Sequence, residues 1–203
     1  MSDNPTLVAA MIAASGFLFH LWLSDMRAFR SGRPNPRAFP GAVPCERQAV
    51  LVAIAGALLL LAMETGGETL LGISDQQSRV TILWSVYTLA AAFMEELAFR
   101  GFLVVDCHGR RLLWSSVVVF SLLFALAHPF LWEWKDGGLL LHFTAKGWFS
   151  TGMAFAGSLW FYAVRFFPLN PRHSLIPCIA AHLTKNLGVF ALKAALGFVS
   201  GWY

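Results

Sequence analysis

Charged residues are scarce in this sequence: they make up 13% of its 203 positions, whereas 57% of the residues are hydrophobic. Soluble globular domains carry roughly 25% charged residues, about twice this share. The mean hydropathy of +0.62 agrees with the shortage of charge. The composition therefore excludes an ordinary water-soluble domain, and we expect an integral membrane protein.

Cysteine is also scarce, and several common motifs are missing. The three cysteines, Cys45, Cys107 and Cys178, are too few and too scattered for a disulfide framework or a cysteine zinc cluster. The sequence has no glycine-rich phosphate loop, no dinucleotide-binding fingerprint and no nucleic-acid-binding motif. We therefore expect no cofactor and no nucleic-acid partner.

Six hydrophobic stretches are long enough, or nearly so, to cross a bilayer as a helix, which takes about 20 apolar residues. They are Pro5–Leu23, Gln48–Met63, Val80–Val105, Leu112–Trp132, Trp148–Phe167 and Leu175–Leu196. No repeat or polar linker divides the chain. We expect an all-α, polytopic membrane helix bundle with about six transmembrane helices, in which residues 1–203 form a single integral-membrane domain. The first stretch has no basic residues before it, so we expect it to be retained rather than removed as a signal peptide.

Basic residues are distributed unevenly over the loops between these stretches. One set of loops carries Arg27, Arg30, Arg33, Arg37, Arg47, Arg110, Arg111, Arg165 and Arg172. The other set carries only Arg79, Lys135 and Lys146. Because basic loops are held in the cytoplasm, we expect both termini outside it, in a multi-pass protein of the inner (plasma) membrane. This topology also accounts for the net charge of +4.

Three short patterns nevertheless place ionisable groups inside the apolar stretches. They lie within Glu95–Arg100, Phe124–His128 and His182–Asn186. A charged side chain at the centre of a bilayer costs about 2.5–3.5 kcal/mol even on insertion scales. The patterns therefore indicate a buried polar site.

The first pattern predicts different environments for two adjacent glutamates. Residues four apart share a helix face, so Glu96 and Arg100 are expected to form an ion pair. Glu95 is turned away by about 100° and is left free to work. Taken alone, this motif is explained equally well by a structural ion pair beside an unrelated acid.

The depths of the other groups favour a common site. Counted from the arginine turn between the third and fourth stretches, Glu95 and His128 lie at similar heights on neighbouring antiparallel helices. His182 and Asn186 are somewhat shallower, and they share one helix face because they are four residues apart. All four side chains are therefore expected to line one intramembrane cavity.

A carboxylate, two imidazoles and an amide together suit the hydrolysis of a carbonyl compound. Glu95 is the candidate general base that takes a proton from water. His128 would orient the same water or protonate the leaving amine. His182 and Asn186 would donate hydrogen bonds to the oxyanion of the tetrahedral intermediate.

These ordered motifs resemble the CAAX protease and bacteriocin-processing family, also called the ABI family. The matching residues are Glu95-Glu96-x-x-x-Arg100-Gly101-Phe102-Leu103, Phe124-x-x-x-His128 and His182-x-x-x-Asn186. They fall within a proposed protease-family core at residues 92–187. The resemblance implies a multi-helix membrane bundle and a glutamate-type intramembrane endopeptidase, and we assign no metal or other cofactor to it.

The resemblance also implies roles and partners. Glu95 would be the water-activating base and His128 its partner. Glu96 and Arg100 would support it. His182 and Asn186 would form the oxyanion side. The expected partners are the lipid bilayer and a membrane-associated peptide or protein substrate. That substrate is left open among prenylated C-terminal tails, bacteriocin or pheromone peptides, and membrane-anchored sorting tails.

Two other hydrolytic mechanisms remain open. Glu95, His128 and His182 would make a two-histidine, one-carboxylate zinc set, although the sequence has no His-Glu-x-x-His motif. A thiol mechanism would use Cys178, which lies one helical turn before His182.

A function without catalysis also remains open. A membrane chaperone, a transporter or an immunity protein would use the same polar pocket for binding or proton movement. Lys185 and Lys193 favour this class, because they add charge to the last stretch that hydrolysis does not need.

Overall fold

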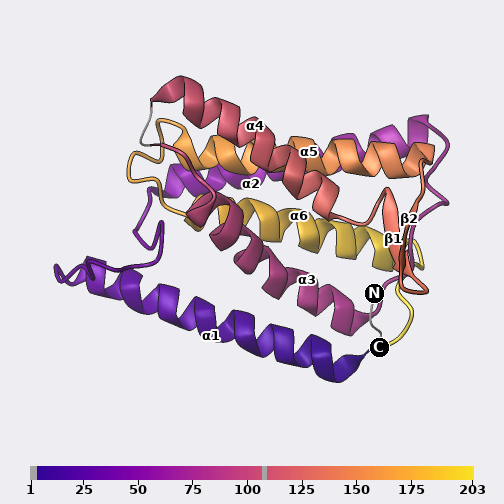
Figure 1. The fold of residues 1–203 in the computed structure, drawn as a ribbon, viewed down its shortest axis with the longest axis horizontal. Coiled ribbons are helices and arrows are strands. Elements are labelled where there is room, and N and C mark those ends of the chain that lie inside the picture. The colour runs from indigo at the N-terminus through magenta and orange to yellow at the C-terminus, as the bar shows by residue number, and fades with distance from the viewer. Residues whose placement is uncertain (1–3, 107–108) are drawn as a thin grey trace.

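The computed structural model describes residues 4–106 and 109–203 (Figure 1). Cys107 lies outside the described residues. Within them, six α-helices form a bundle: α1 Pro5–Arg30, α2 Arg47–Leu70, α3 Ile82–Glu95, α4 Arg110–Ala127, α5 Ala145–Phe166 and α6 Ile176–Ala195. A π-helix, η1 Glu96–Phe102, continues α3, and two short strands follow α4: β1 Trp132–Lys135 and β2 Gly138–Leu141. The predicted all-α membrane bundle is therefore confirmed.

Apolar side chains cover the outside of this bundle. Four of the described helical segments are long and apolar enough to cross a membrane: α1, α2, α3 with η1, and α4. On α4, Leu122 and Leu123 are half exposed, which suits contact with lipid. Helices α5 and α6 are of similar length but turn polar side chains inward, among them Ser158 and His182. The arrangement places polar groups between helices and hydrocarbon outside.

Helices α2, α5 and α6 pack closely because glycines let them approach. A Cβ built on Gly56 of α2 would lie 2.2 Å from an indole carbon of Trp160 on α5. That indole is also fixed by a hydrogen bond from its Nε1 to the Ala53 carbonyl, 3.1 Å away. Small residues serve this purpose in membrane helices, where van der Waals packing drives association.

Replacing Gly56 by Ala is therefore expected to destabilise the bundle by about 1–3 kcal/mol, the usual cost of overpacking. Thermal unfolding in detergent micelles measures the effect. Gly16→Ala on α1 is the matched control, because nothing lies within 4 Å of its Cβ position. An unfolding temperature of Gly56→Ala equal to that of Gly16→Ala would contradict this packing.

The chain after α4 departs from the prediction. The predicted stretch Leu112–Trp132 is wrong at its end, since α4 stops at Ala127 and Trp132 begins a strand. The physical reason is Pro129, because proline pushes the residue before it out of the helical region. His128 accordingly adopts an extended backbone with φ −76° and ψ 133°.

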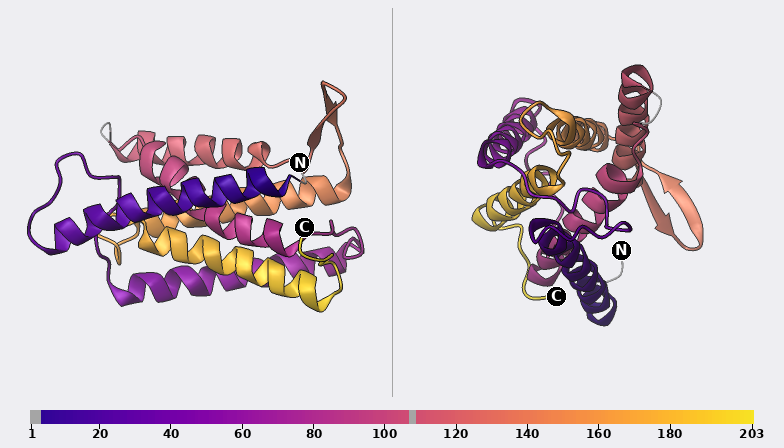
Figure 2. Two further views of the ribbon diagram at one scale, coloured as in Figure 1. Left: turned by 90° about the horizontal axis from the view of Figure 1, so that it is seen from below. Right: turned by 90° about the vertical axis from the view of Figure 1, so that its left-hand side faces the viewer.

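The two strands form an amphipathic hairpin that projects from the bundle (Figure 2). Asp136 and Gly137 connect them, both with positive φ, as a tight two-residue turn requires. The pairs Trp132 with Leu141 and Trp134 with Leu139 share one face, because facing partners in a ladder lie on the same side. The other face carries Glu133 and Lys135.

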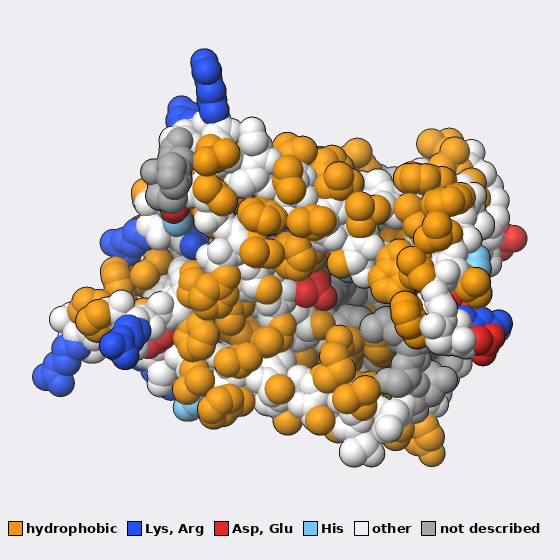
Figure 3. All heavy atoms as spheres, in the orientation of Figure 1, with side chains coloured by type: hydrophobic (Ala, Val, Ile, Leu, Met, Phe, Trp, Pro, Cys, Tyr) orange, Lys and Arg blue, Asp and Glu red, His pale blue; other side chains and the backbone are white. Residues whose placement is uncertain are grey.

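The loops separate into two ends of the bundle (Figure 1). One end holds the segment between α1 and α2, the residues after η1, and the α5–α6 connection, which are the loops rich in arginine. The hairpin, the start of α1 and the C-terminus lie at the other end. Lys and Arg side chains gather mainly at the first end in the space-filling view (Figure 3).

Candidate active site

The site is built around a change of helix type at the two glutamates. Helix α3 ends at Glu95, and the π-helix η1 begins at Glu96. The wider turn ends with the Leu103 amide donating to the carbonyl of Ala98, five residues earlier, at 2.9 Å. Insertions of this kind occur often at functional sites. The prediction of one continuous stretch over Val80–Val105 did not include it.

Glu96 is fully buried and is the centre of the polar network. Its Oε1 accepts a hydrogen bond from Arg100 Nη1 at 3.2 Å, so the predicted ion pair is present. The same oxygen accepts from His182 Nδ1 at 2.7 Å. Two donors on Oε1 offset part of the cost of burying the charge, while Oε2 has no hydrogen-bond partner among the described residues. Glu96 therefore has the environment of a structural carboxylate.

Arg100 is also fully buried and ties η1 to α5. Its Nη2 donates to Ser158 Oγ at 2.5 Å, and Ser158 Oγ donates to Ser121 Oγ on α4 at 3.0 Å. The guanidinium carbon lies 4.5 Å from the ring centre of Phe124, within the range of a cation–π interaction. Neither serine was predicted, because each reads as an ordinary small residue in an apolar helix.

A second side chain of α5, that of Tyr162, also supports η1; it lies one helical turn after Ser158. The Tyr162 hydroxyl lies 2.6 Å from the carbonyl of Phe99 and 3.1 Å from that of Leu103. Carbonyls at a helix end lack partners within the helix, so a buried hydroxyl satisfies them. Ser158 and Tyr162, four residues apart on α5, thus hold the whole of η1.

Glu95 differs sharply from its neighbour. Its side chain is 33% exposed, whereas that of Glu96 is completely buried. Its Oε2 lies 3.7 Å from His182 Nε2, close enough for electrostatic contact but longer than a hydrogen bond. Acidic side-chain atoms appear midway along an otherwise hydrophobic face of the molecule (Figure 3). Glu95 is therefore the accessible carboxylate of the pair, as the sequence predicted.

His182 joins the two glutamates. Its Nδ1 carries the proton that Glu96 accepts, which leaves Nε2 facing Glu95. The imidazole stacks on Phe161 with ring centres 4.8 Å apart and meets Phe124 edge-on at 6.0 Å. In the neutral ring Nε2 is an acceptor, so donation to an oxyanion, as predicted for His182, requires the imidazolium form.

His128 is the C-cap of α4, one residue beyond the last helical residue, Ala127. Its Nδ1 donates to the Phe124 carbonyl at 2.8 Å, which leaves Nε2 as a free acceptor in the neutral ring. The ring also lies 4.7 Å from the Phe124 ring centre and stacks on Phe130 at 5.6 Å. Phe124 thus contacts both His128 and His182.

Asn186 lies on the same face of α6 as His182, as predicted. Its Nδ2 donates to the carbonyl of Thr88 on α3 at 3.0 Å. Thr88 precedes Glu95 by two helical turns, so α6 runs antiparallel to α3 along the site. One amide proton of Asn186 is used by this contact, and the second is available to a ligand.

The residues of the alternative mechanisms are placed differently. Among the described residues, no group of three His, Cys, Asp or Glu side chains is arranged to hold a metal ion. The proposed set of Glu95, His128 and His182 is thus not formed by this geometry. Cys178 is fully buried in the hydrophobic core with Trp22 and Phe93, without access for a substrate.

The lysines that favoured a binding function have partners. Lys185 Nζ lies 2.8 Å from Glu64 Oε2, and Lys193 Nζ donates to the Ser78 carbonyl at 2.5 Å. Lys185 is therefore ion-paired, and Lys193 is hydrogen-bonded to neutral oxygens of Ser78.

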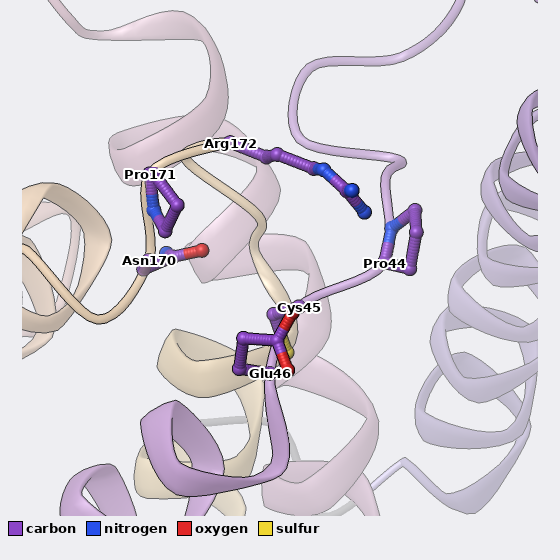
Figure 4. Close-up of a pocket in the computed structure, with 6 residues that line it drawn as sticks. All are labelled: Pro44, Cys45, Glu46, Asn170, Pro171 and Arg172. Atoms are coloured by element: carbon purple, nitrogen blue, oxygen red, sulfur yellow. The ribbon is translucent and has the colours of Figure 1, made fainter.

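A separate small pocket lies at the arginine-rich end (Figure 4). It is lined by Pro44, Cys45, Glu46, Asn170, Pro171 and Arg172. Burial raises the pKa of the Cys45 thiol, which therefore stays protonated at neutral pH. The Asn170 amide already donates to carbonyls at the end of α5 and to that of Ser174 in its own loop. No predicted site residue lines this pocket, so the candidate active site is the cluster at η1.

Removing Arg100 is expected to leave Glu96 buried without its cation. Arg100→Ala should therefore lower the free energy of unfolding by about 3–5 kcal/mol. Denaturant unfolding in detergent, followed by tryptophan fluorescence, measures the change. Arg111→Ala, at an exposed position of α4, should have little effect, and equal losses in the two variants would argue against the buried network.

Comparison with known proteins gives one match. The model of the type II CAAX prenyl endopeptidase Rce1-like family matches residues 77–188, more than half of the chain. The matched range contains every residue of the cluster at η1. No curated protein and no solved structure matches the chain. The family match agrees with the resemblance inferred from the three motifs.

Proposed function

Because the chain belongs to the Rce1-like family of type II CAAX prenyl endopeptidases, we propose that it cleaves a membrane-associated peptide or protein tail with a water activated by Glu95. At the family level the protein is a CAAX-type intramembrane endopeptidase. The proposal adds the identity of the base, the supporting residues and a catalytic core at residues 92–187.

The contrast between the two glutamates carries this proposal. Glu96 is fully buried and saturates one oxygen with Arg100 and His182. Glu95, one residue earlier, keeps an exposed carboxylate beside the same imidazole. A base must reach water, and an orienting residue must not move. The adjacent glutamates therefore divide these two tasks.

The reaction begins with a water held between the Glu95 carboxylate and the acceptor Nε2 of His128. Glu95 takes one proton as the water oxygen bonds to the scissile carbonyl carbon, which gives a tetrahedral oxyanion. The second amide proton of Asn186 hydrogen-bonds this oxyanion, with His182 assisting when it is protonated. The proton held by Glu95 then passes to the leaving nitrogen as the carbon–nitrogen bond breaks.

Glu95→Gln is expected to lower kcat by about 10²–10⁴-fold, the usual contribution of general base catalysis. The substrate is first identified by comparing membrane peptides from cells with the wild-type protein and with Glu95→Gln, seeking a tail that is no longer trimmed. Cleavage of that peptide by purified protein then gives kcat.

Glu96→Gln and a stability measurement complete this test. Glu95→Gln should unfold at nearly the wild-type temperature, because the carboxylate is partly exposed. Glu96→Gln should lower the unfolding temperature, because it breaks a buried ion pair. Wild-type kcat in Glu95→Gln would rule out the proposed base.

We also propose that the arginine-rich end faces the cytoplasm, in the inner (plasma) membrane. The support is the separation of basic loops to one end of the bundle (Figure 3). In a variant whose native cysteines are replaced by Ser, Arg33→Cys should react with an impermeant maleimide only after the cells are opened. Lys135→Cys on the hairpin should react in intact cells. The reverse pattern would overturn the orientation.

A further inference from the structure

Two ion pairs lie outside the candidate active site, in the half of the bundle away from the arginine-rich loops. Glu64 of α2 pairs with Lys185 of α6 at 2.8 Å. Glu68, one turn later on α2, pairs with Lys146 of α5. The four side chains are 9–19% exposed. Charges buried between the helices of a membrane bundle need a reason, because burying them is costly.

The Lys185 pair is set apart by its neighbours on α6. Lys185 directly precedes Asn186 and follows His182 by three residues. Its hydrocarbon chain runs over Gly157 of α5, where an added Cβ would meet Lys185 Cε at 3.9 Å. Gly157 in turn precedes Ser158, the partner of Arg100. The lysine is therefore in contact with the scaffold of the site but not with its reacting groups.

Three polar side chains of α6 bind three different elements. His182 donates to Glu96 of η1, Asn186 donates to Thr88 of α3, and Lys185 pairs with Glu64 of α2. His182 and Asn186 share the face of α6 that meets α3 and η1, whereas Lys185 reaches α2 on another side of the helix. The first two involve groups that catalysis itself uses. Of these three contacts, that of Lys185 ties α6 to a helix outside the catalytic cluster, one turn of α6 from His182 and next to Asn186.

We propose that Glu64 and Lys185 are positioning residues that set the rotation of α6 and thereby hold His182 and Asn186 against α3. The effect on catalysis rests on the proposed function, whereas the effect on the helix does not. A rotation of about 20° moves an atom at the helix surface, about 5–6 Å from the axis, by about 2 Å. Displacements of about 1 Å can reduce catalysis by about 10²-fold.

The Glu68–Lys146 pair provides a matched control. It is buried to a similar extent and also starts from α2, but its lysine is on α5 rather than on α6. Both pairs can be neutralised together with their partners, which avoids leaving one unpaired buried charge. The two variants are Glu64→Gln with Lys185→Met, and Glu68→Gln with Lys146→Met.

Peptide cleavage gives the first measurement. Neutralising the Glu64–Lys185 pair should lower kcat by about 10–100-fold while KM changes less than about twofold, because the groups are misplaced rather than removed. Neutralising the control pair should leave kcat within about twofold. The exchanged pair, Glu64→Lys with Lys185→Glu, should restore most of the activity. Equal kcat values in the two neutralised variants would overturn the proposal.

Cys178 gives a second measurement that does not depend on activity. This thiol is on α6, one turn before His182, and is fully buried. With Cys45 and Cys107 replaced by Ser, a membrane-permeant maleimide should label Cys178 faster when the Glu64–Lys185 pair is neutralised. Labelling should stay slow in the control variant and in the exchanged pair.

The two measurements separate the possible failures. If Cys178 labelling responds as expected but the wild-type protein cleaves no peptide, the positioning role stands and the proposed function fails. If labelling is the same in both neutralised variants, the positioning role is wrong whatever the activity. If the neutralised variant does not fold, the exchanged pair decides: recovery of slow labelling and of kcat supports the proposal, and folding without recovery of either overturns it.

Discussion

The hydrogen bond between His182 and Glu96 is the contact on which the rest of the site depends. It connects α6 to η1, which are separated by 86 positions in the sequence. Glu96 is held from the other side by Arg100, which is bound in turn to α5 through Ser158. A single buried carboxylate thus sets the relative position of three helical elements. Because an unpaired charge in the bilayer is so unfavourable, this network has few alternative arrangements.

The same network explains how two identical residues in succession come to behave differently. Adjacent positions on a helix point about 100° apart. Glu96 points into the interior, where Arg100 and His182 donate hydrogen bonds to it. Glu95 points to the partly open side of the bundle. The polypeptide obtains a fixed carboxylate and an accessible carboxylate from one dipeptide. The imidazole of His182 is hydrogen-bonded to the fixed carboxylate of Glu96 and also lies beside the accessible carboxylate of Glu95. The position of Glu96 therefore fixes the imidazole that faces Glu95.

Much of this architecture was predictable from residue spacing. The apolar stretches predicted the helices, and the four-residue interval between Glu96 and Arg100 predicted their ion pair, because both depend on local helical geometry. The shared face of His182 and Asn186 followed from the same interval. The catalytic roles of these residues remain predictions.

The errors arose where local rules compete. Pro129 ended α4 early, so the predicted stretch Leu112–Trp132 ran past the helix end at Ala127. The dipeptide Asp136-Gly137 is a strong signal for a tight hairpin, and the predicted helical stretches on either side of it did not include the two strands. Ser121 and Ser158 gave no usable signal, because a serine in a membrane helix more often serves packing than binding. The π-helix depends on tertiary contacts from Tyr162 that no local pattern reveals.

The residues at and just before the start of the hairpin pack against the end of α4. The Trp132 indole donates to the Leu126 carbonyl at 2.8 Å, and Phe130 stacks on His128. An extramembrane connection would ordinarily be the most mobile part of such a chain. Here the contacts of Trp132 and Phe130 restrict the movement of the His128 imidazole at the end of α4. The connecting segment thus orders the site although it contributes no reacting atom.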